Sequence, residues 1–189
     1  MRIALIIGTV WLALATAAVA GGLTAQLQPP GPQVVLASLT ALLVAAGALL
    51  PPVRRWALAL DPRVPVSLHL TRFVGAYFLV LYGRGELPYS FAVPGGIGDV
   101  VVASLAAVLL LTTSPHTRAG RRLYLGWNML GLVDILGVVA AAAAEWLADP
   151  ASMRPLVTLP LGLLPTFLVP LIIATHVLLF VLLLRKRPA

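Results

Sequence analysis

Long runs of apolar residues, separated by short polar or Pro- and Gly-rich breaks, dominate this chain. A run of about 20 apolar residues is the length that an α-helix needs to cross the hydrocarbon core of a bilayer. The expected spans are residues 3–25, 34–50, 65–82, 97–113, 123–147 and 159–184. The pattern therefore predicts an all-α fold: a polytopic integral membrane protein with a bundle of six transmembrane helices, forming one membrane domain over residues 1–189.

The first apolar run can be interpreted in two ways. Arg2 precedes it, and Ala18-Val19-Ala20 before Gly21 resembles the cleavage site of a signal peptide. We expect the run to remain in the protein as a helix, and a cleaved signal peptide is the alternative.

Two of the breaks are expected to be structured. In residues 51–64, which are basic, Val53, Trp56 and Leu60 recur at helical spacing. Such a segment can lie as a helix in the plane of the membrane interface, and a basic connector with one anchoring Trp is the alternative. Residues 83–96 are rich in Gly and Pro without being polar, so we expect an outer loop packed on the bundle.

Composition and charge support the membrane class and narrow the partners. Of the residues, 60% are hydrophobic and 10% are charged, whereas about 25% are charged in a soluble domain. The formal net charge of +7 comes from basic residues beside apolar runs, which favours membrane lipids with anionic headgroups at the cytoplasmic face, and no nucleic acid. The absence of Cys excludes disulfides, thiolate metal sites and Cys nucleophiles.

The basic residues also predict the orientation of the chain. Basic loops stay preferentially on the cytoplasmic side of a membrane. When the loops are assigned alternately to two sides, one side collects Arg2, Arg54, Arg55, Arg63, Arg118, Arg121, Arg122, Arg185, Lys186 and Arg187, and the other only Arg84 and Arg154. We therefore expect a multi-pass protein of a cytoplasmic-type cell membrane, such as a cell inner membrane, with both termini cytoplasmic.

Two opposite charges are expected to meet inside the bundle. Asp134 is near the midpoint of the run 123–147, and Arg72 is within about one turn of the midpoint of the run 65–82. Either charge alone in hydrocarbon would cost several kcal/mol, so the two side chains are predicted to pair.

Further polar residues are expected at a similar depth. His69 lies one helical turn from Arg72 on the same face, and Asn128 and His176 belong to the same half of the bundle. These residues and Asp134 are expected to converge on one cavity, with Asn128 on a different helix face from Asp134. Close helix approach is expected at Gly75, Gly126, Gly131 and Gly137, with the third helix packed on the fifth at Gly75 and Gly131. In a purely structural interpretation, the ion pair only fixes the helix register.

Asp99 has two predicted roles. It follows the loop 83–96 near the start of the run 97–113, where a carboxylate can cap exposed amides and complement the helix dipole. In that role it lies at the outer face, with Glu86, Glu145 and Asp149. It is also a candidate binding residue, together with Arg72 and Asp134.

Two classes of function use the buried residues. The first is a transporter- or channel-like protein whose buried polar site binds or conducts a small solute or ion, supported by the central charges and by a last helix bent at Pro165 and Pro170. The second is an electron carrier that binds b-type haem or quinone, with His69 and His176 as candidate haem ligands.

A third class needs no buried site. The protein would be a non-catalytic subunit or assembly factor of a larger membrane complex, with Trp56, Tyr82 and Trp146 as interfacial anchors. The possible protein partners are thus the members of such a complex or, for any of the three classes, further copies of the chain in a homo-oligomer. An enzyme is disfavoured, because the chain has no nucleophile motif, HExxH sequence or phosphate-binding Gly loop. We therefore assign no catalytic residue and no metal site.

Overall fold

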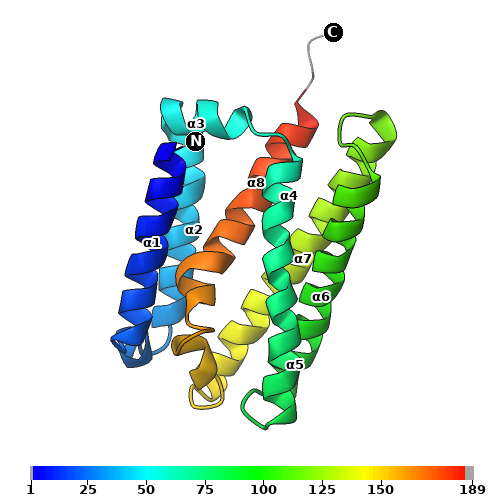
Figure 1. The fold of residues 1–189 in the computed structure, drawn as a ribbon. Helices are drawn as coiled ribbons and strands as arrows, with labels where there is room; N and C mark the ends of the chain where they lie inside the picture. Colours follow the sequence, from blue (N-terminus) through cyan, green and yellow to red (C-terminus); the bar gives the residue numbers. More distant parts are fainter. Residues whose placement is uncertain (1, 186–189) are drawn as a thin grey trace.

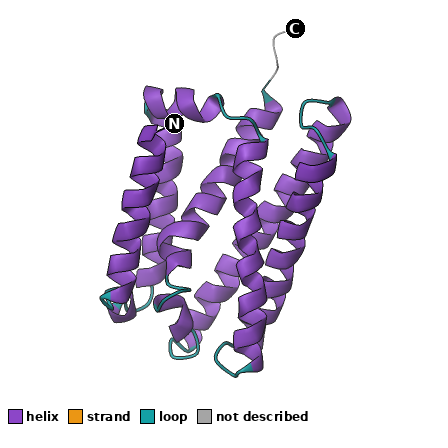
Figure 2. Cartoon of the chain, in the orientation of Figure 1, coloured by secondary structure: helices purple, strands orange, loops and turns teal. Residues whose placement is uncertain are grey.

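The computed structural model describes residues 2–185, with side chains from residue 5 onward; Lys186 and Arg187, which the prediction of orientation uses, lie outside this part. The described part is all-helical, with 82% helix and no strand. Figure 1 shows the helices side by side as a bundle, and Figure 2 shows the loops mainly at its two ends. The elements are α1 (Arg2–Ala20), η1 (Thr24–Gln26), α2 (Gly31–Leu49), α3 (Pro51–Leu58), α4 (Arg63–Leu68), η2 (His69–Val74), α5 (Gly75–Gly83), α6 (Tyr89–Thr112), α7 (Arg118–Ala148), η3 (Arg154–Val157), η4 (Leu164–Leu168) and α8 (Val169–Leu184).

Five helical stretches of the described chain are long and apolar enough to cross a membrane. The first apolar helix, Leu5–Ala20, is shorter, so the count of six spans stays a prediction. The five stretches are Gly31–Leu49, Arg63–Gly83, Tyr89–Thr112, Arg118–Ala148 and Leu164–Leu184.

The predicted helix 65–82 corresponds to one rod built from three segments. The 3₁₀ segment η2 follows α4 directly and continues into α5. In a 3₁₀ segment, side chains three residues apart lie in line. His69 and Arg72 have this spacing and are both buried. The tighter winding of η2 therefore directs both side chains into the same part of the interior.

The outer loop predicted over residues 83–96 is wrong in its second half, because α6 begins at Tyr89. The helix continues through Pro94 and the buried Gly96. A Cβ atom at Gly96 would lie 2.7 Å from the carbonyl oxygen of Gly75. Glycine therefore lets α6 pack closely on α5, and this tertiary contact outweighs its low helix propensity.

The last apolar run is also divided differently from the prediction. η4 is a single π-helical turn, and α8 begins only at Val169. Pro165 lies in the first turn of this helical stretch, where the missing N–H of proline costs little, and Pro170 lies where the π-helical turn passes into α8. The irregularity expected at the two prolines is thus a π-helical turn at the start of the last helical stretch.

The segment predicted over residues 51–64 forms α3 and the start of α4. Figure 1 shows α3 lying across one end of the bundle, above α1 and α2. On α3, Trp56 is 42% exposed, whereas the next residue, Ala57, is buried. The exposed Arg54 and Arg55 give this end of the molecule a basic surface.

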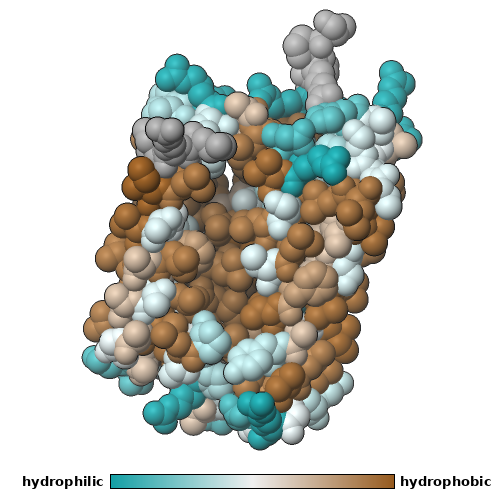
Figure 3. Space-filling model, viewed as in Figure 1, coloured by the Kyte–Doolittle hydropathy of each residue, from teal (hydrophilic) through white to brown (hydrophobic). Residues whose placement is uncertain are grey.

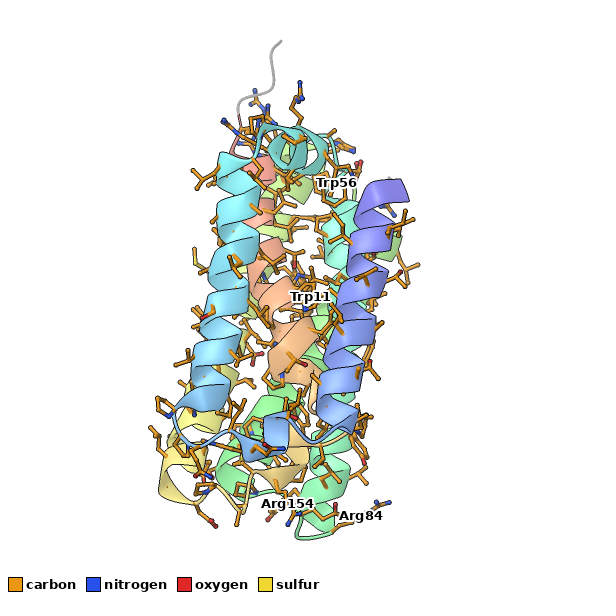
Figure 4. The ribbon with its side chains drawn as sticks, turned by 90° about the vertical axis from the view of Figure 1, so that its left-hand side faces the viewer. Trp11, Trp56, Arg84 and Arg154 are labelled. Carbon is orange, nitrogen blue, oxygen red and sulfur yellow. The ribbon has the colours of Figure 1, made fainter. Side chains whose placement is uncertain are left out.

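α6 organises the tightly packed part of the fold. It packs on η2, α5 and α7, and α8 packs on α7 and α2. α1 contacts the rest chiefly at η4, where Trp11 Nε1 donates a 3.0 Å hydrogen bond to the carbonyl oxygen of Thr166. The Trp11 ring also packs on Phe167, and Figure 4 shows this residue turned from α1 toward the bundle. The interior that holds the charged residues is therefore built by elements after α3.

Candidate functional site

A charged cluster lies in the interior between η2, α6 and α7. The Arg72 side chain is 1% exposed, and its Nε donates a 2.6 Å hydrogen bond to Asp99 Oδ1. Its Nη1 donates to the carbonyl oxygen of Gly131 at 3.0 Å, and its Nη2 donates to Asp134 Oδ2. The predicted contact between Arg72 and Asp134 is present. A second carboxylate completes a cluster that we call the charged triad: Arg72, Asp99 and Asp134.

The predicted role of Asp99 as an outer helix cap is wrong. α6 begins ten residues earlier, at Tyr89, and Asp99 is 4% exposed within the helix. Reading residues 83–96 as a loop placed the helix start near Ile97, which put Asp99 into an exposed first turn. In the structure, Asp99 is an interior ion-pair partner of Arg72.

The triad does not balance its formal charges. One guanidinium faces two carboxylates, so the sum is −1 when all three groups are ionised. The Asp99 side chain is 5% exposed and that of Asp134 is 20% exposed, so most of the carboxylate surface is withdrawn from the surroundings. A buried excess charge is costly unless a proton or another cation neutralises it.

The helices around the triad do not pack in the predicted way. A Cβ atom at Gly75 would lie 2.5 Å from Asp99 Cβ, so Gly75 faces α6. A Cβ atom at Gly131 would lie 2.7 Å from His176 Cε1, so Gly131 faces α8. The predicted packing of the third helix on the fifth at these glycines is therefore wrong, and the long Arg72 side chain makes the connection instead.

The two predicted histidines form a second cluster beside the triad. The rings of His69 and His176 are 4.3 Å apart between centroids, and both residues are fully buried. His176 Nδ1 and Asn128 Oδ1 are 2.8 Å apart, and Asn128 Nδ2 donates to the carbonyl oxygen of His176 at 3.1 Å. His69 Nε2 lies 3.2 Å from Thr175 Oγ1, whereas its Nδ1 has no hydrogen-bond partner. The Trp127 ring packs edge-on against His69.

The structure thus brings the predicted residues together as two adjoining clusters. Gly131 connects them, because its carbonyl oxygen accepts from Arg72 and its Cα lies beside His176. Asn128 and Asp134 have different partners, as expected for residues on different faces of one helix.

The histidine pair does not fit a haem. Two axial ligands must lie on opposite faces of the macrocycle, with the iron between them. Rings 4.3 Å apart leave no room for a macrocycle between His69 and His176. Among the described residues, no group of three or more His, Asp or Glu side chains could hold a metal ion.

An apolar cavity of about 90 Å³ borders the triad. Its polar lining residues include Arg72, Asp99, Gln33 and Trp146. Its remaining wall is apolar and comes from α2, α5, α6, α7, η4 and α8 and from their connections, including Leu36, Phe78, Phe91, Ile135, Val139, Ala142, Leu168 and Ile172.

Sequence reasoning missed this cavity and the role of Trp146. Trp146 was expected to anchor the protein at a membrane interface, but it is 6% exposed and turns into the cavity. A Trp at the end of an apolar run gives the same pattern whether its ring points outward or inward. Gln33 lies in the first turn of α2, directly after a polar turn. From the sequence it was therefore indistinguishable from a residue of that turn.

Comparisons with known proteins identify a family but no characterised relative. No curated protein and no solved structure matches the chain. Residues 29–184 match a family described as a domain of unknown function, DUF8737. This match leaves out α1 and includes every residue of the two clusters and the cavity. Because it covers most of the chain, the protein belongs to the DUF8737 family.

Proposed function

We propose that the protein is an integral membrane protein that binds a proton or a small cation at the charged triad and carries it through the bundle. The membrane part of this proposal is supported by the five long apolar helices and by their outward surfaces. α2 buries none of its residues, and Figure 3 shows apolar side chains over the middle of the visible face, with polar ones at both ends. Such an apolar belt suits the hydrocarbon core of a bilayer.

The orientation proposed for the chain has both termini on the cytoplasmic side of a cell inner membrane. Basic residues on α3, at the starts of α4 and α7 and at the end of α8 lie at the end of the bundle that α3 covers. Arg84 and Arg154 lie at the opposite end in Figure 4. This asymmetry agrees with the preference of basic loops for the cytoplasm. Six spans, with α1 as the first, complete the proposed topology.

One observation supports the proposal that the triad binds an ion. Arg72 is buried between two carboxylates, which come from two different helices. A pair that only fixed the helix register would need one carboxylate. The second carboxylate gives the site an excess negative charge, which a proton or a small cation would neutralise. Intramembrane carboxylates of this kind are typical of ion and proton pathways.

The three members of the triad differ in what they face. Arg72 and Asp99 line the cavity. The Asp134 side chain, on α7, is not part of the cavity lining and is one-fifth exposed. A proton or cation could therefore reach the triad at Asp134 as well as through the cavity, which supports transport in addition to binding.

Infrared difference spectroscopy of the purified protein tests ion binding. Over a pH range in which exposed carboxylates stay ionised, the carbonyl band of a protonated carboxylic acid should grow in the wild type as the pH falls; if a cation occupies the site, Na⁺ or K⁺ should shift the carboxylate bands instead. Asp99→Asn and Asp134→Asn should each abolish the response, because one remaining carboxylate balances Arg72. Glu86→Gln, which removes an exposed carboxylate outside the triad, is the control and should leave the response unchanged. Wild-type spectra that respond to neither pH nor cations contradict the proposal.

Transport is tested in liposomes that contain a pH-sensitive or cation-sensitive dye. Under an imposed membrane potential, the wild type should move protons or the cation found by spectroscopy, and Asp134→Asn should reduce the flux to that of protein-free liposomes. Flux that is equal in the wild type and in Asp134→Asn contradicts transport through the triad.

The alternative of a non-catalytic subunit or assembly factor also has a structural observation in its favour. The outward face of α2 is apolar and is available to another membrane protein as well as to lipid. Native mass spectrometry of gently solubilised membranes distinguishes the two: a complex with other proteins favours a subunit, whereas a monomer or homo-oligomer favours the transporter.

A further inference from the structure

The hydrogen bonds around His176 fix which of its ring nitrogens carries the hydrogen. The carbonyl oxygen of His176 can only accept, so the Asn128 side chain must present its Nδ2 group there, at 3.1 Å. The Oδ1 atom of the same amide then faces His176 Nδ1 at 2.8 Å. Because an amide oxygen is an acceptor, Nδ1 is the donor, and the other ring nitrogen of neutral His176, Nε2, carries a lone pair.

The same reasoning assigns the opposite tautomer to His69. Thr175 has one hydroxyl hydrogen, which it donates to the carbonyl oxygen of Ile172 at 2.8 Å. Towards His69 Nε2, at 3.2 Å, the hydroxyl is therefore an acceptor, so Nε2 carries the hydrogen and Nδ1 the lone pair. The two lone-pair nitrogens, His176 Nε2 and His69 Nδ1, are buried and have no hydrogen-bond partner. The pair thus presents two free basic nitrogens to the interior of the bundle.

A proton is the ligand that suits these two nitrogens. The ring centroids of His69 and His176 are 4.3 Å apart, and the Trp127 ring packs edge-on against His69 at 5.0 Å. A proton needs no space between such closely packed rings, whereas a solute does. A metal ion needs further protein ligands, and no third His, Asp or Glu completes a metal-binding group in the described chain.

The balance of charge limits the pair to one proton. With all three groups of the triad ionised, the charges sum to −1. One imidazolium brings the sum for the two clusters to zero, which is the favourable state of a buried site. Two imidazolium rings 4.3 Å apart would repel each other and leave an excess positive charge. The interior therefore suits one proton and offers two places for it, a carboxyl group of the triad and an imidazole of the pair.

The charged groups that border the histidine pair are those of the triad, on η2, α6 and α7. α8 has no titratable residue besides His176. Tyr124 on α7 directs its hydroxyl to the carbonyl oxygens of Leu109 and Thr113. The basic residues of α4 and of the start of α7 are exposed. The triad therefore determines how favourable a proton on the pair is.

The pair lies between the triad and the proposed cytoplasmic end. His69 precedes Arg72 by three residues in η2, which corresponds to about 6 Å along the axis. α4 precedes η2 and lies at the end that α3 covers, so His69 is nearer to this end than Arg72. Gly131 contacts both clusters, since its carbonyl oxygen accepts from Arg72 Nη1 and a Cβ atom there would lie 2.7 Å from His176 Cε1.

We propose that the histidine pair, His69 and His176, is a second proton site that exchanges one proton with the charged triad. In the exchange, a carboxylic acid of the triad loses its O–H proton and becomes a carboxylate, and an imidazole gains an N–H bond and becomes an imidazolium. This inference rests on the proposed function and deepens it, because it identifies the ion as a proton and adds a second site on the path to the cytoplasmic end.

Nitrogen NMR of the full-length protein in lipid bilayers, with ¹⁵N-labelled histidine, tests the proposal. The chain contains three histidines, and His116→Gln removes the exposed one, which leaves four ring nitrogens to observe. At high pH, the hydrogen should be on Nδ1 of His176 and on Nε2 of His69. As the pH falls through the range of the infrared response of the triad, one of the two lone-pair nitrogens, or half of each, should become protonated. Lone-pair signals that stay unchanged over this range overturn the inference.

A variant of the triad tests the exchange between the two clusters. Asp134→Asn leaves one carboxylate to balance Arg72, so a proton on the histidines is no longer favoured. Their response should move to lower pH by about 1 unit or more, the usual effect of removing a nearby opposite charge. Glu86→Gln is the control and should leave the response in place. Histidines that respond at the same pH in Asp134→Asn and in the wild type contradict the exchange.

Proton flux in the liposome assay tests the role of the pair in the path. The double variant His69→Gln, His176→Gln should lose the flux, and its infrared carbonyl band should exceed that of the wild type, because the proton then has only the triad. His116→Gln should keep the flux. Circular dichroism and thermal unfolding verify that the variants fold, and the NMR experiment, which leaves the pair intact, decides the question if the double variant does not. A folded double variant with the flux of the wild type overturns the inference.

Failure of the proposed function looks different from failure of this inference. Carboxylate bands that shift with Na⁺ or K⁺, together with histidines that stay neutral, would leave ion binding at the triad intact and overturn the proton exchange. A wild type without any infrared response would contradict ion binding itself.

Discussion

Arg72 is the residue on which the order of the interior depends. Its three guanidinium nitrogens donate to Asp99, to the backbone of Gly131 and to Asp134, which ties η2 to α6 and α7. Removing one partner of a buried ion pair destabilises a protein more than replacing the whole pair with apolar residues. Replacing all three residues of the triad should therefore cost less stability than replacing Arg72 alone, although both changes remove the charged groups that would bind an ion.

Replacement of Arg72 with Met is expected to leave two unpaired carboxylates in the interior. The free energy of unfolding should fall by about 3–5 kcal/mol, the range for breaking a buried ion pair from one side. Reversible unfolding in mixed detergent micelles measures this loss. Replacing Asp99 and Asp134 with Leu in the same Arg72→Met chain should recover most of the stability but no ion binding. An Arg72→Met protein as stable as the wild type would show that the triad contributes nothing to the fold.

At the scale of elements, the contact between α5 and α6 positions the triad. Gly75 and Gly96 face each other, and a side chain at either position would collide with the other helix. Close helix contacts were also predicted at Gly126 and Gly137, and these predictions are wrong. A Cβ atom at either position would meet nothing within 4 Å. Spacing along one helix cannot distinguish these cases, since it does not show which neighbour faces which turn.

Gly75→Val is expected to separate α5 from α6 and pull Asp99 away from Arg72. The cost should be about 1–3 kcal/mol, as for overpacked interiors, and the infrared response of the triad should weaken. Gly137→Ala is the matched control; it should stabilise the protein by up to about 1 kcal/mol, because Ala is the better helix former and the space is free. Thermal unfolding by circular dichroism compares the two. Equal stabilities would contradict the close packing.

At the scale of the whole molecule, the proposed orientation can be measured without removing any native thiol, because the chain contains no Cys. Single substitutions Arg84→Cys, Arg154→Cys and Arg121→Cys place a thiol at exposed positions near the two ends. In intact cells, a membrane-impermeant maleimide should label Arg84→Cys and Arg154→Cys, and should label Arg121→Cys only after permeabilisation. The reverse pattern would invert the topology.

The sequence was sufficient for the helical class, the approximate positions of the long apolar helices and the meeting of Arg72 with Asp134. These features depend on the length of apolar runs and on the cost of isolated charges, which are properties of single segments. The start of α6, the interior position of Asp99 and the inward turn of Trp146 depend on contacts between segments. A stretch rich in Pro and Gly reads as a loop unless its packing partner is known, and that misreading hid Asp99.

The separation of the triad along the chain has a consequence for biosynthesis. Asp99 follows Arg72 by 27 residues, and Asp134 follows it by 62. At a translation rate of about 5–20 residues per second, the ribosome adds these 62 residues in about 3–12 s. During that interval the nascent helix carries an arginine whose counter-charges are incomplete. In the proposed membrane topology, the insertion machinery must therefore keep this helix close to water or to itself until α7 emerges, so the release of the helix that carries Arg72 into lipid is tied to the synthesis of α7.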